Sequence, residues 1–495
     1  MSQEAKASPA NTNLPSIPPA GAAKASVRRK ALDGLDWYLA GDEPPQVKRD
    51  GSGLWQPCFL FRGRENWLAR LPEGDDKKPP VKDIQQEARA LVARWLKMQN
   101  LCVLVGAGAS SYATKFVTSG LFDQIQTILK DRPSYTTLTS LLSLCSEPSK
   151  IGSRLEDFLS QISGFVHLAD AEKQPLDRLR LEPALATEKT KDLTPKALRE
   201  LLLDIERAII VSCNVFLPPS ALDLSGEELS AHESFLSKLL ARDPLQGRAR
   251  IFTLNYDTLI EQALDRLGAM YWDGFAGTIS RRFDPSTYAL DWHYPGEVTE
   301  GRVRRYDKAV HLYKLHGSVN WRRTETAAQN PFGIKFATHQ APTLEEWQKN
   351  AKVLDDTLRA GEGLAILPTA AKYGESLAMP YAHLFRSLGQ SLQQSQTALF
   401  VTGYGGWDSH INQVVEDALT NPGFVCVFID PKPSEWALKL CRADYCGRVY
   451  CFGGQWGTFE AFSDEVMPDL EALSTDLEVA RTLRELQKTR IRQGE

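Results

Sequence analysis

One short stretch, residues 101–110 with the sequence LCVLVGAGAS, constrains the fold more than any other part of the chain. Its first five residues are an apolar run, which is typical of a strand buried on both faces of a parallel sheet. The glycine-rich turn that comes next, residues 106–110, would let backbone N–H groups approach a diphosphate closely. A tight strand-to-helix turn without any ligand would show the same pattern. The segment therefore predicts a buried parallel strand, and a nucleotide site is one of two interpretations of the turn.

Charge and hydropathy exclude several classes of protein. The chain has 495 residues, with 58 Lys and Arg against 62 Asp and Glu, and the net charge of −4 gives no sign of a nucleic-acid-binding surface. No apolar run reaches the length needed to cross a bilayer. The N-terminal residues are polar and lack the apolar core of a signal peptide, so we expect a cytoplasmic protein that contacts no membrane.

The eight cysteines are scattered and include no Cys-x-x-Cys pair. Cys441, Cys446 and Cys451 lie five residues apart, but zinc knuckles use shorter spacings and a fourth ligand is not evident. We therefore expect reduced thiols and no bound metal.

Short apolar segments alternate with helical patterns from about residue 83 onward, which predicts an α/β fold with an open parallel sheet. Polar or glycine-rich turns come after nearly every one of these segments, and in such a sheet ligands bind at the carboxyl ends of the strands. After the strand at 101–105, the expected strands are residues 250–254, 309–315, 363–367, 398–402, 425–429 and 448–452.

The chain divides into four parts by composition. Residues 1–30 are poor in bulky apolar side chains, so we expect them to be disordered. Residues 31–82 form a small aromatic-rich extension, and residues 83–465 form the main domain with a helical insertion at about 134–242. Residues 466–495 have an amphipathic helical pattern. Both the extension and this last helix could pack on the main domain or on a neighbouring subunit.

Polar side chains gather at the predicted strand ends. Asn255 and Asp257 follow the second strand, His316 follows the third, a second glycine turn at 403–406 follows the fifth, and Asp430 follows the sixth. Each residue alone has a structural explanation, because Asn255 could begin a helix, Asp257 could be its N-cap and His316 could lie in a turn. Their shared place at one sheet edge favours a ligand site.

Other polar residues fit structural roles. Asp408 is placed to cap a helix at 409–419, and Thr194 with Pro195 to begin the longest helix of the insertion. We expect His311 to be exposed on its strand and His410 to lie in a helical turn.

Four motifs, in this order and at these strand ends, resemble the sirtuin (Sir2) superfamily, and most of all the bacterial Sir2-like NAD-consuming effectors of antiphage defence. The resemblance covers about residues 83–460 and implies a Rossmann-like sheet. The motifs are Gly106-Ala107-Gly108-Ala109-Ser110, Thr253-Leu254-Asn255-Tyr256-Asp257, His316-Gly317-Ser318 and residues 403–412.

The resemblance implies a role for each matching residue. Asn255 corresponds to the catalytic asparagine, Asp257 to its partner in the nicotinamide-side pocket, and His316 to the catalytic histidine. Asp430 would accept hydrogen bonds from the adenine ribose of NAD. The remaining residues that the resemblance places around NAD are Gly106, Ala107, Gly108, Ser110, Thr253, Gly403 and Gly405.

The sequence departs from the sirtuin deacetylases. It has no cysteine between Cys213 and Cys426, where deacetylases carry a zinc module, and Leu254 replaces the usual glutamine of the catalytic motif. Water is then the expected acceptor, and the hypothesis is an NAD+ glycohydrolase that releases nicotinamide and ADP-ribose. The alternatives are a protein deacylase or ADP-ribosyltransferase, a non-catalytic NAD or ADP-ribose sensor, and a scaffold. The resemblance also implies a homo-oligomer, with a HerA-like ATPase as a possible activating partner.

Overall fold

The computed structural model describes residues 46–48, 55–66, 81–114, 118–144, 155, 158–164, 193–223, 226, 228–243, 245–294, 305–365, 380–443 and 445–469. Its centre is a sheet in the order β1-β2-β15-β14-β13-β4-β5-β9-β6, with β3 paired to β2. The strands of this sheet are β1 Gln46–Lys48, β2 Trp55–Arg62, β3 Glu65–Asn66, β4 Asn100–Val105, β5 Arg250–Thr253, β6 Met270–Trp272, β9 Ala309–Lys314, β13 Thr397–Thr402, β14 Phe424–Ile429 and β15 Val449–Gly454.

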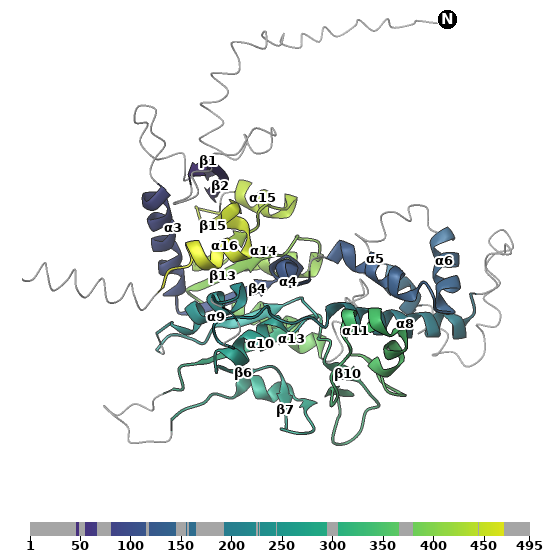
Figure 1. Cartoon of the computed structure of the whole chain (residues 1–495). Helices are drawn as coiled ribbons and strands as arrows, with labels where there is room; N and C mark the ends of the chain where they lie inside the picture. The colour runs from purple at the N-terminus through teal and green to yellow at the C-terminus, as the bar shows by residue number, and fades with distance from the viewer. Residues whose placement is uncertain are drawn as a thin grey trace, which may run out of the picture.

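The run of strands from β15 to β6 is parallel throughout, whereas β2 joins β15 in the antiparallel direction. Helices cover both faces of the sheet (Figure 1). This is the α/β, Rossmann-like architecture that the sequence predicts. The α-helices are α3 Val81–Leu96, α4 Ser111–Thr114, α5 Thr118–Leu129, α6 Ser134–Leu144, α8 Pro195–Cys213, α9 Ala231–Leu240, α10 Leu259–Arg266, α11 Leu344–Lys349, α13 Tyr381–Leu392, α14 Ser409–Ala418, α15 Glu435–Arg442 and α16 Phe459–Ala461.

Strand β4 shows why the apolar run at 101–105 is buried on both faces. Leu101, Val103 and Val105 belong to a core that includes side chains of α3, α9 and α10. Cys102 and Leu104 point the other way, into a core that includes side chains of α13, α14 and α15. Successive side chains of a strand alternate between faces, so a strand between two helical layers must be apolar at every position.

The strand order reverses direction at β4. The chain next enters the sheet at β5 on one side of β4, whereas the later strands β13, β14 and β15 extend from its other side. Loops that leave neighbouring strands in opposite directions open a crevice at the carboxyl ends, and this is where ligands bind in doubly wound sheets. One row of paired residues marks that edge, namely Ile429, Thr402, Val105, Thr253 and Lys314.

Helices α5, α6 and α8 lie together to one side of the sheet (Figure 1) and share a core of their own. Helix α8 begins as the sequence predicts, because the Thr194 side chain accepts a hydrogen bond from the Ala197 backbone N–H and a proline occupies the first helical turn. Of the insertion expected at about 134–242, α6 and α8 lie in this separate core together with α5, which precedes it, whereas α9 packs on the main sheet.

The expected strand at 363–367 is the main error in the sequence-based fold. In the described part of this segment, residues 363–365, Gly363–Leu364 form a strand, β12, which pairs antiparallel with β10 in a second sheet of order β12-β10-β11-β8-β7. A short apolar run before a proline does not reveal which sheet it joins, because pairing is decided by distant residues. The other strands of this sheet are β7 Phe275–Ala276, β8 Arg282–Phe283, β10 Trp321–Arg323 and β11 Ile334–Phe336.

Two further expectations concern the chain ends. In the expected extension at 31–82, strand β2 adds to the outer edge of the main sheet by pairing with β15. The disordered segment expected at 1–30 and the helix expected from Leu470 onward lie outside the described residues. Among the helices that the structure describes, none is long and apolar enough to cross a membrane.

Candidate functional site at the carboxyl edge of the sheet

The two glycine turns pack directly against each other where β4 and β13 end. The Gly106 backbone N–H donates to the Thr402 carbonyl at 2.9 Å, and the Gly108 N–H donates to the Gly403 carbonyl at 2.9 Å. Gly403 has a φ of +64°, and a Cβ on it would lie 2.1 Å from the Ala109 nitrogen. A side chain at these positions would force the turns apart.

This contact explains why glycines are needed in the two turns. The explanation differs from the one proposed from the sequence, in which glycines let backbone N–H groups approach a diphosphate. The N–H groups of Gly106 and Gly108 are already engaged with the carbonyls of Thr402 and Gly403, so a bound diphosphate would have to be held by other groups of the turn. The glycines allow two backbone turns to meet at van der Waals distance. Their role toward NAD stays a prediction.

Asn255 joins the catalytic motif after β5 to the first glycine turn. Its side-chain Nδ2 donates to the Gly106 carbonyl at 3.1 Å and to the Ser110 hydroxyl at 2.9 Å. Because a carbonyl can only accept, the amide nitrogen must face Gly106 and the amide oxygen must point away. That oxygen is buried and has no hydrogen-bond partner among the described residues, and the whole residue is only 7% exposed. A buried acceptor left unsatisfied is rare and marks a place for a ligand group or water.

Thr253 positions the backbone of Asn255. It is fully buried at the end of β5, and its hydroxyl accepts a hydrogen bond of 3.1 Å from the Asn255 backbone N–H. This contact favours a supporting role for Thr253 over the direct contact with NAD that the resemblance implies.

Asp257 lies two residues further on and is also buried. Its carboxylate accepts a 3.1 Å hydrogen bond from the Leu259 backbone N–H at the start of α10, whose N-cap residue is Thr258, one residue later than the sequence predicts. Burial raises the pKa of this carboxyl, and the Lys314 ammonium and hydrogen bonds from Leu259 and Ser110 oppose that rise.

Lys314, at the end of β9, is a buried cation that sequence reasoning missed. It is 1% exposed, and its Nζ donates to the Asp257 backbone carbonyl and to the Glu261 carboxylate, the latter at 2.9 Å. Burial raises the pKa of Glu261, and Lys314 is the strongest opposing influence. The lysine therefore ties the Asn255–Asp257 turn and α10 to the neighbouring strand. A lysine at the end of a mostly apolar strand was the available signal.

His316 follows β9 and lies against Asp408, which comes shortly after the second glycine turn. The His316 Nε2 and the Asp408 Oδ2 lie 3.3 Å apart, with side chains 6% and 8% exposed. The other oxygen of Asp408 caps α14 by accepting from the backbone N–H groups of His410 and Ile411. Sequence reasoning found the capping role of Asp408 and missed its contact with His316, because a helix N-cap fully accounted for the aspartate.

The remaining predicted residues lie on the same edge. Asp430 comes directly after β14, its Oδ1 accepts a 2.9 Å hydrogen bond from the Lys432 N–H, and burial raises the pKa of its carboxyl to about 6. Gly405 lies in the second glycine turn beneath the indole of Trp407, which is 88% exposed. Both residues thus lie in turns at the carboxyl edge of the sheet, and their predicted contacts with NAD stay predictions.

His311 differs from the sequence-based expectation. It is half-buried on β9, where its ring stacks on Trp272 at a centroid distance of 4.9 Å, and burial with the nearby Arg250 lowers its pKa to about 4. The expected exposure was wrong because Trp272, on the neighbouring strand β6, stacks on the His311 ring, and β6 was not predicted.

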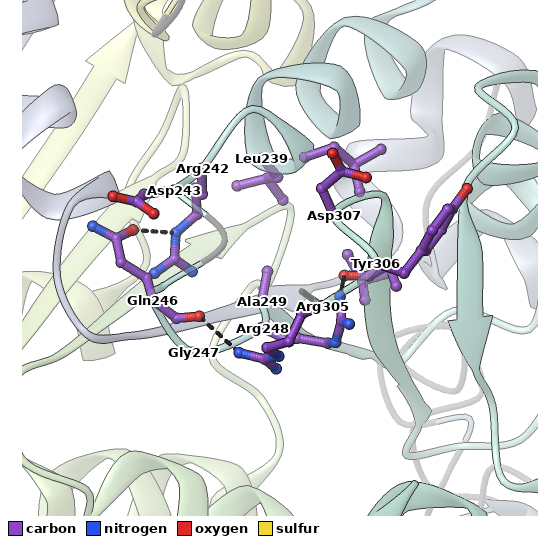
Figure 2. A pocket seen from close by; sticks show the side chains of 13 residues that line it. Leu239, Arg242, Asp243, Gln246, Gly247, Arg248, Ala249, Arg305, Tyr306 and Asp307 are labelled. Atoms are coloured by element: carbon purple, nitrogen blue, oxygen red, sulfur yellow. Dashed lines mark hydrogen bonds between the residues drawn. The ribbon is translucent and has the colours of Figure 1, made fainter. Parts of the chain in front are cut away.

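A small cavity of about 30 Å³ lies at the opposite edge of the sheet, where Ala249 precedes β5 and Ala309 begins β9 (Figure 2). Arg242 in its wall contacts Gln246 at 3.3 Å, and Arg305 donates to the Gln246 carbonyl at 3.2 Å. The cavity has room for about one or two water molecules. None of the residues that line it belongs to the candidate site at the carboxyl edge.

Comparison with known families bears on the same residues. Residues 249–443 match the family model of the SIR2-like domain. This stretch of the chain is thus similar to the SIR2-like domain, and the match suggests an NAD-related activity in general. It includes Asn255, His316, the second glycine turn and Asp430, and it begins after the first glycine turn. No curated protein matches the chain.

Proposed function

We propose that the protein is an NAD+ glycohydrolase, which cleaves NAD+ to nicotinamide and ADP-ribose. The observation that carries the proposal is the buried, unpartnered Oδ1 of Asn255 at the sheet edge where ligands bind in this class of fold. The SIR2-like match adds the expectation of NAD, and His316 lies on the same edge.

The chemistry requires a group that stabilises positive charge. When the bond between ribose C1′ and the nicotinamide nitrogen breaks, its electron pair stays with nicotinamide and positive charge develops on C1′. An amide oxygen held in a dry, fixed position stabilises such charge or positions the attacking water. Asn255 meets this requirement because Gly106 and Ser110 fix its amide nitrogen and thereby direct its oxygen.

Water completes the reaction. A bond forms between the water oxygen and C1′, and the water gives up a proton, so that NAD+ and water yield nicotinamide, ADP-ribose and a proton. An imidazole can accept a proton from the water or from a ribose hydroxyl near neutral pH. His316 is the histidine that the resemblance assigns to this task.

Hydrolysis is favoured over deacylation by the segment between His316 and the second glycine turn. This cysteine-free segment contains the antiparallel strands β10, β11 and β12 and helix α11. Deacetylases place their zinc module in this part of the chain. Without four cysteines for zinc, the sequence does not encode that acyl-lysine clamp.

The test is release of nicotinamide from NAD+ by the purified protein. We expect Asn255→Ala and His316→Ala each to lower kcat by roughly a hundredfold or more, since one positioned polar group contributes about that much. His293→Ala, at an exposed histidine, is the matched control and should behave as wild type. Radiolabel from NAD+ that ends on protein would indicate a transferase instead, and NAD+ binding with no turnover would indicate a sensor.

We also propose a role in antiphage defence, in which NAD+ depletion halts an infected cell, with a homo-oligomer and a HerA-like ATPase as the activating assembly. This rests on the resemblance to bacterial Sir2-like effectors. Cellular NAD+ should fall after phage infection in cells that express the wild type and stay constant with Asn255→Ala. Equal NAD+ levels in both would contradict this role.

A further inference from the structure

We propose that Asp408 is a positioning residue for His316, whose carboxylate sets the tautomer and orientation of the imidazole. The catalytic meaning of this inference rests on the proposed function. The geometric part does not, because it concerns two side chains within the described structure.

His316 and Asp408 are far apart in the sequence, and the strands that precede them are not neighbours in the sheet. Asp408 follows β13 and His316 follows β9, and β4 and β5 lie between these two strands. Three strand spacings amount to about 14 Å. The two turns must therefore converge over the ends of β4 and β5 to bring the Nε2 and Oδ2 atoms to 3.3 Å. The Asn255 turn follows one of the strands that they cross.

The Asp408 carboxylate is held rigidly. Its Oδ1 accepts from the backbone N–H groups of His410 at 3.0 Å and Ile411 at 3.4 Å. The Tyr404 hydroxyl accepts from the Asp408 backbone N–H at 3.0 Å, and its single proton has two acceptors within reach, the Asp408 carbonyl at 3.0 Å and the Asn412 Oδ1 at 2.9 Å. With one oxygen committed to the helix, the other lies 3.3 Å from the His316 Nε2, an ion-pair contact that lacks hydrogen-bond geometry.

A fixed carboxylate next to one ring nitrogen has a defined effect. It favours the tautomer in which Nε2 carries the proton, so the basic lone pair resides on Nδ1. It also offers a counter-charge when the ring takes up a proton, as the aspartate does in Ser-His-Asp triads. An amide in its place could donate to Nε2 and reverse the tautomer.

The two roles of Asp408 can be separated by substitution. Asn and Ser are as good at a helix N-cap as Asp, so Asp408→Asn and Asp408→Ser keep the cap of α14. Neither provides a carboxylate to His316. The matched control is Asp284→Asn, which changes another N-cap aspartate whose Oδ1 accepts from the Ser286 N–H.

We expect Asp408→Asn to lower kcat for NAD+ cleavage at least tenfold, with KM and the thermal midpoint close to wild type, and Asp284→Asn to leave kcat unchanged. Asp408→Ser should also lower kcat. Wild-type kcat in Asp408→Asn would overturn the proposal. So would a loss of activity that accompanies a matching drop in thermal midpoint, since that result assigns Asp408 to the cap alone.

An independent measurement keeps the inference testable if the wild type cleaves no NAD+. Nitrogen NMR of protein labelled with ¹⁵N-histidine, with His316 assigned by its loss in His316→Gln, reports which ring nitrogen is protonated. We expect Nε2–H in the wild type and Nδ1–H in Asp408→Asn. Nδ1–H in the wild type would refute the positioning role, whereas absence of turnover alone would refute only the proposed reaction.

Discussion

Gly403→Ala tests the contact between the two glycine turns. The new Cβ would lie 2.1 Å from the Ala109 nitrogen and 2.8 Å from the Gly106 carbonyl oxygen and the Gly108 carbonyl carbon. All three are backbone atoms, so no side chain can swing away. Restoring an ordinary contact of 3.4 Å requires the turns to separate by about 1 Å, which would break the 2.9 Å hydrogen bond from Gly108 to Gly403.

The cost has several parts. A residue with a side chain at a φ of +64° costs about 1–3 kcal/mol. Overpacking costs about 1–3 kcal/mol more, and loss of a buried backbone hydrogen bond costs about 1–3 kcal/mol. We therefore expect Gly403→Ala to lower the free energy of unfolding by roughly 3–9 kcal/mol in total.

The control comes from the same chain. Gly268 has the same φ of +64°, and no atom lies within 4 Å of a Cβ built on it. Gly268→Ala therefore carries only the conformational cost. Urea unfolding of both variants isolates the effect of the close contact. We expect Gly403→Ala to lower the free energy of unfolding by at least about 2 kcal/mol more than Gly268→Ala does. Equal destabilisation of the two variants would refute the argument that the turns pack too closely for a side chain.

Two further predictions concern buried charges. Lys314→Met leaves the Glu261 carboxylate buried without its cation, which should lower the free energy of unfolding in urea by about 3–5 kcal/mol. Adding Glu261→Gln should recover part of this loss. Full stability of the Lys314→Met variant would contradict the ion pair. Asp430 has a pKa raised to about 6 by burial, so the folded state holds its proton more tightly than the unfolded chain. Its stabilising contribution is present below about pH 4 and is lost as the pH rises through about 6, by at most about 3 kcal/mol. Asp430→Asn should therefore gain stability relative to wild type between about pH 4.5 and about pH 7.5, and a constant difference would exclude the raised pKa.

Much of the fold could be predicted from local patterns. The strands at 101–105, 250–254, 309–315, 398–402, 425–429 and 448–452 are present within one or two residues at each end. These strands are apolar on both faces because helices cover both sides of the sheet, and that requirement is visible along a single segment. The N-caps Thr194 and Asp408 were predictable for the same reason, since a cap depends on its own first helical turn.

Contacts between distant segments were not predictable in this way. Asp408 carries a sufficient local explanation as an N-cap, and only the strand order shows that its second oxygen faces His316. Lys314 shares the edge row with Thr253 and reaches α10, which requires knowing that β9 lies beside β5. The short run at 363–364 joined a second sheet for a similar reason.

Local patterns along the chain specify which residues stand at the carboxyl ends of parallel strands, because burial and turn chemistry act over a few residues. Which of those ends converge depends on the order of strands in the sheet, and that order is set by pairings between segments hundreds of residues apart. The glycines illustrate the division. Their positions are plain in the sequence, but the close approach of Gly403 to Ala109 that demands them exists only once β4 and β13 lie side by side.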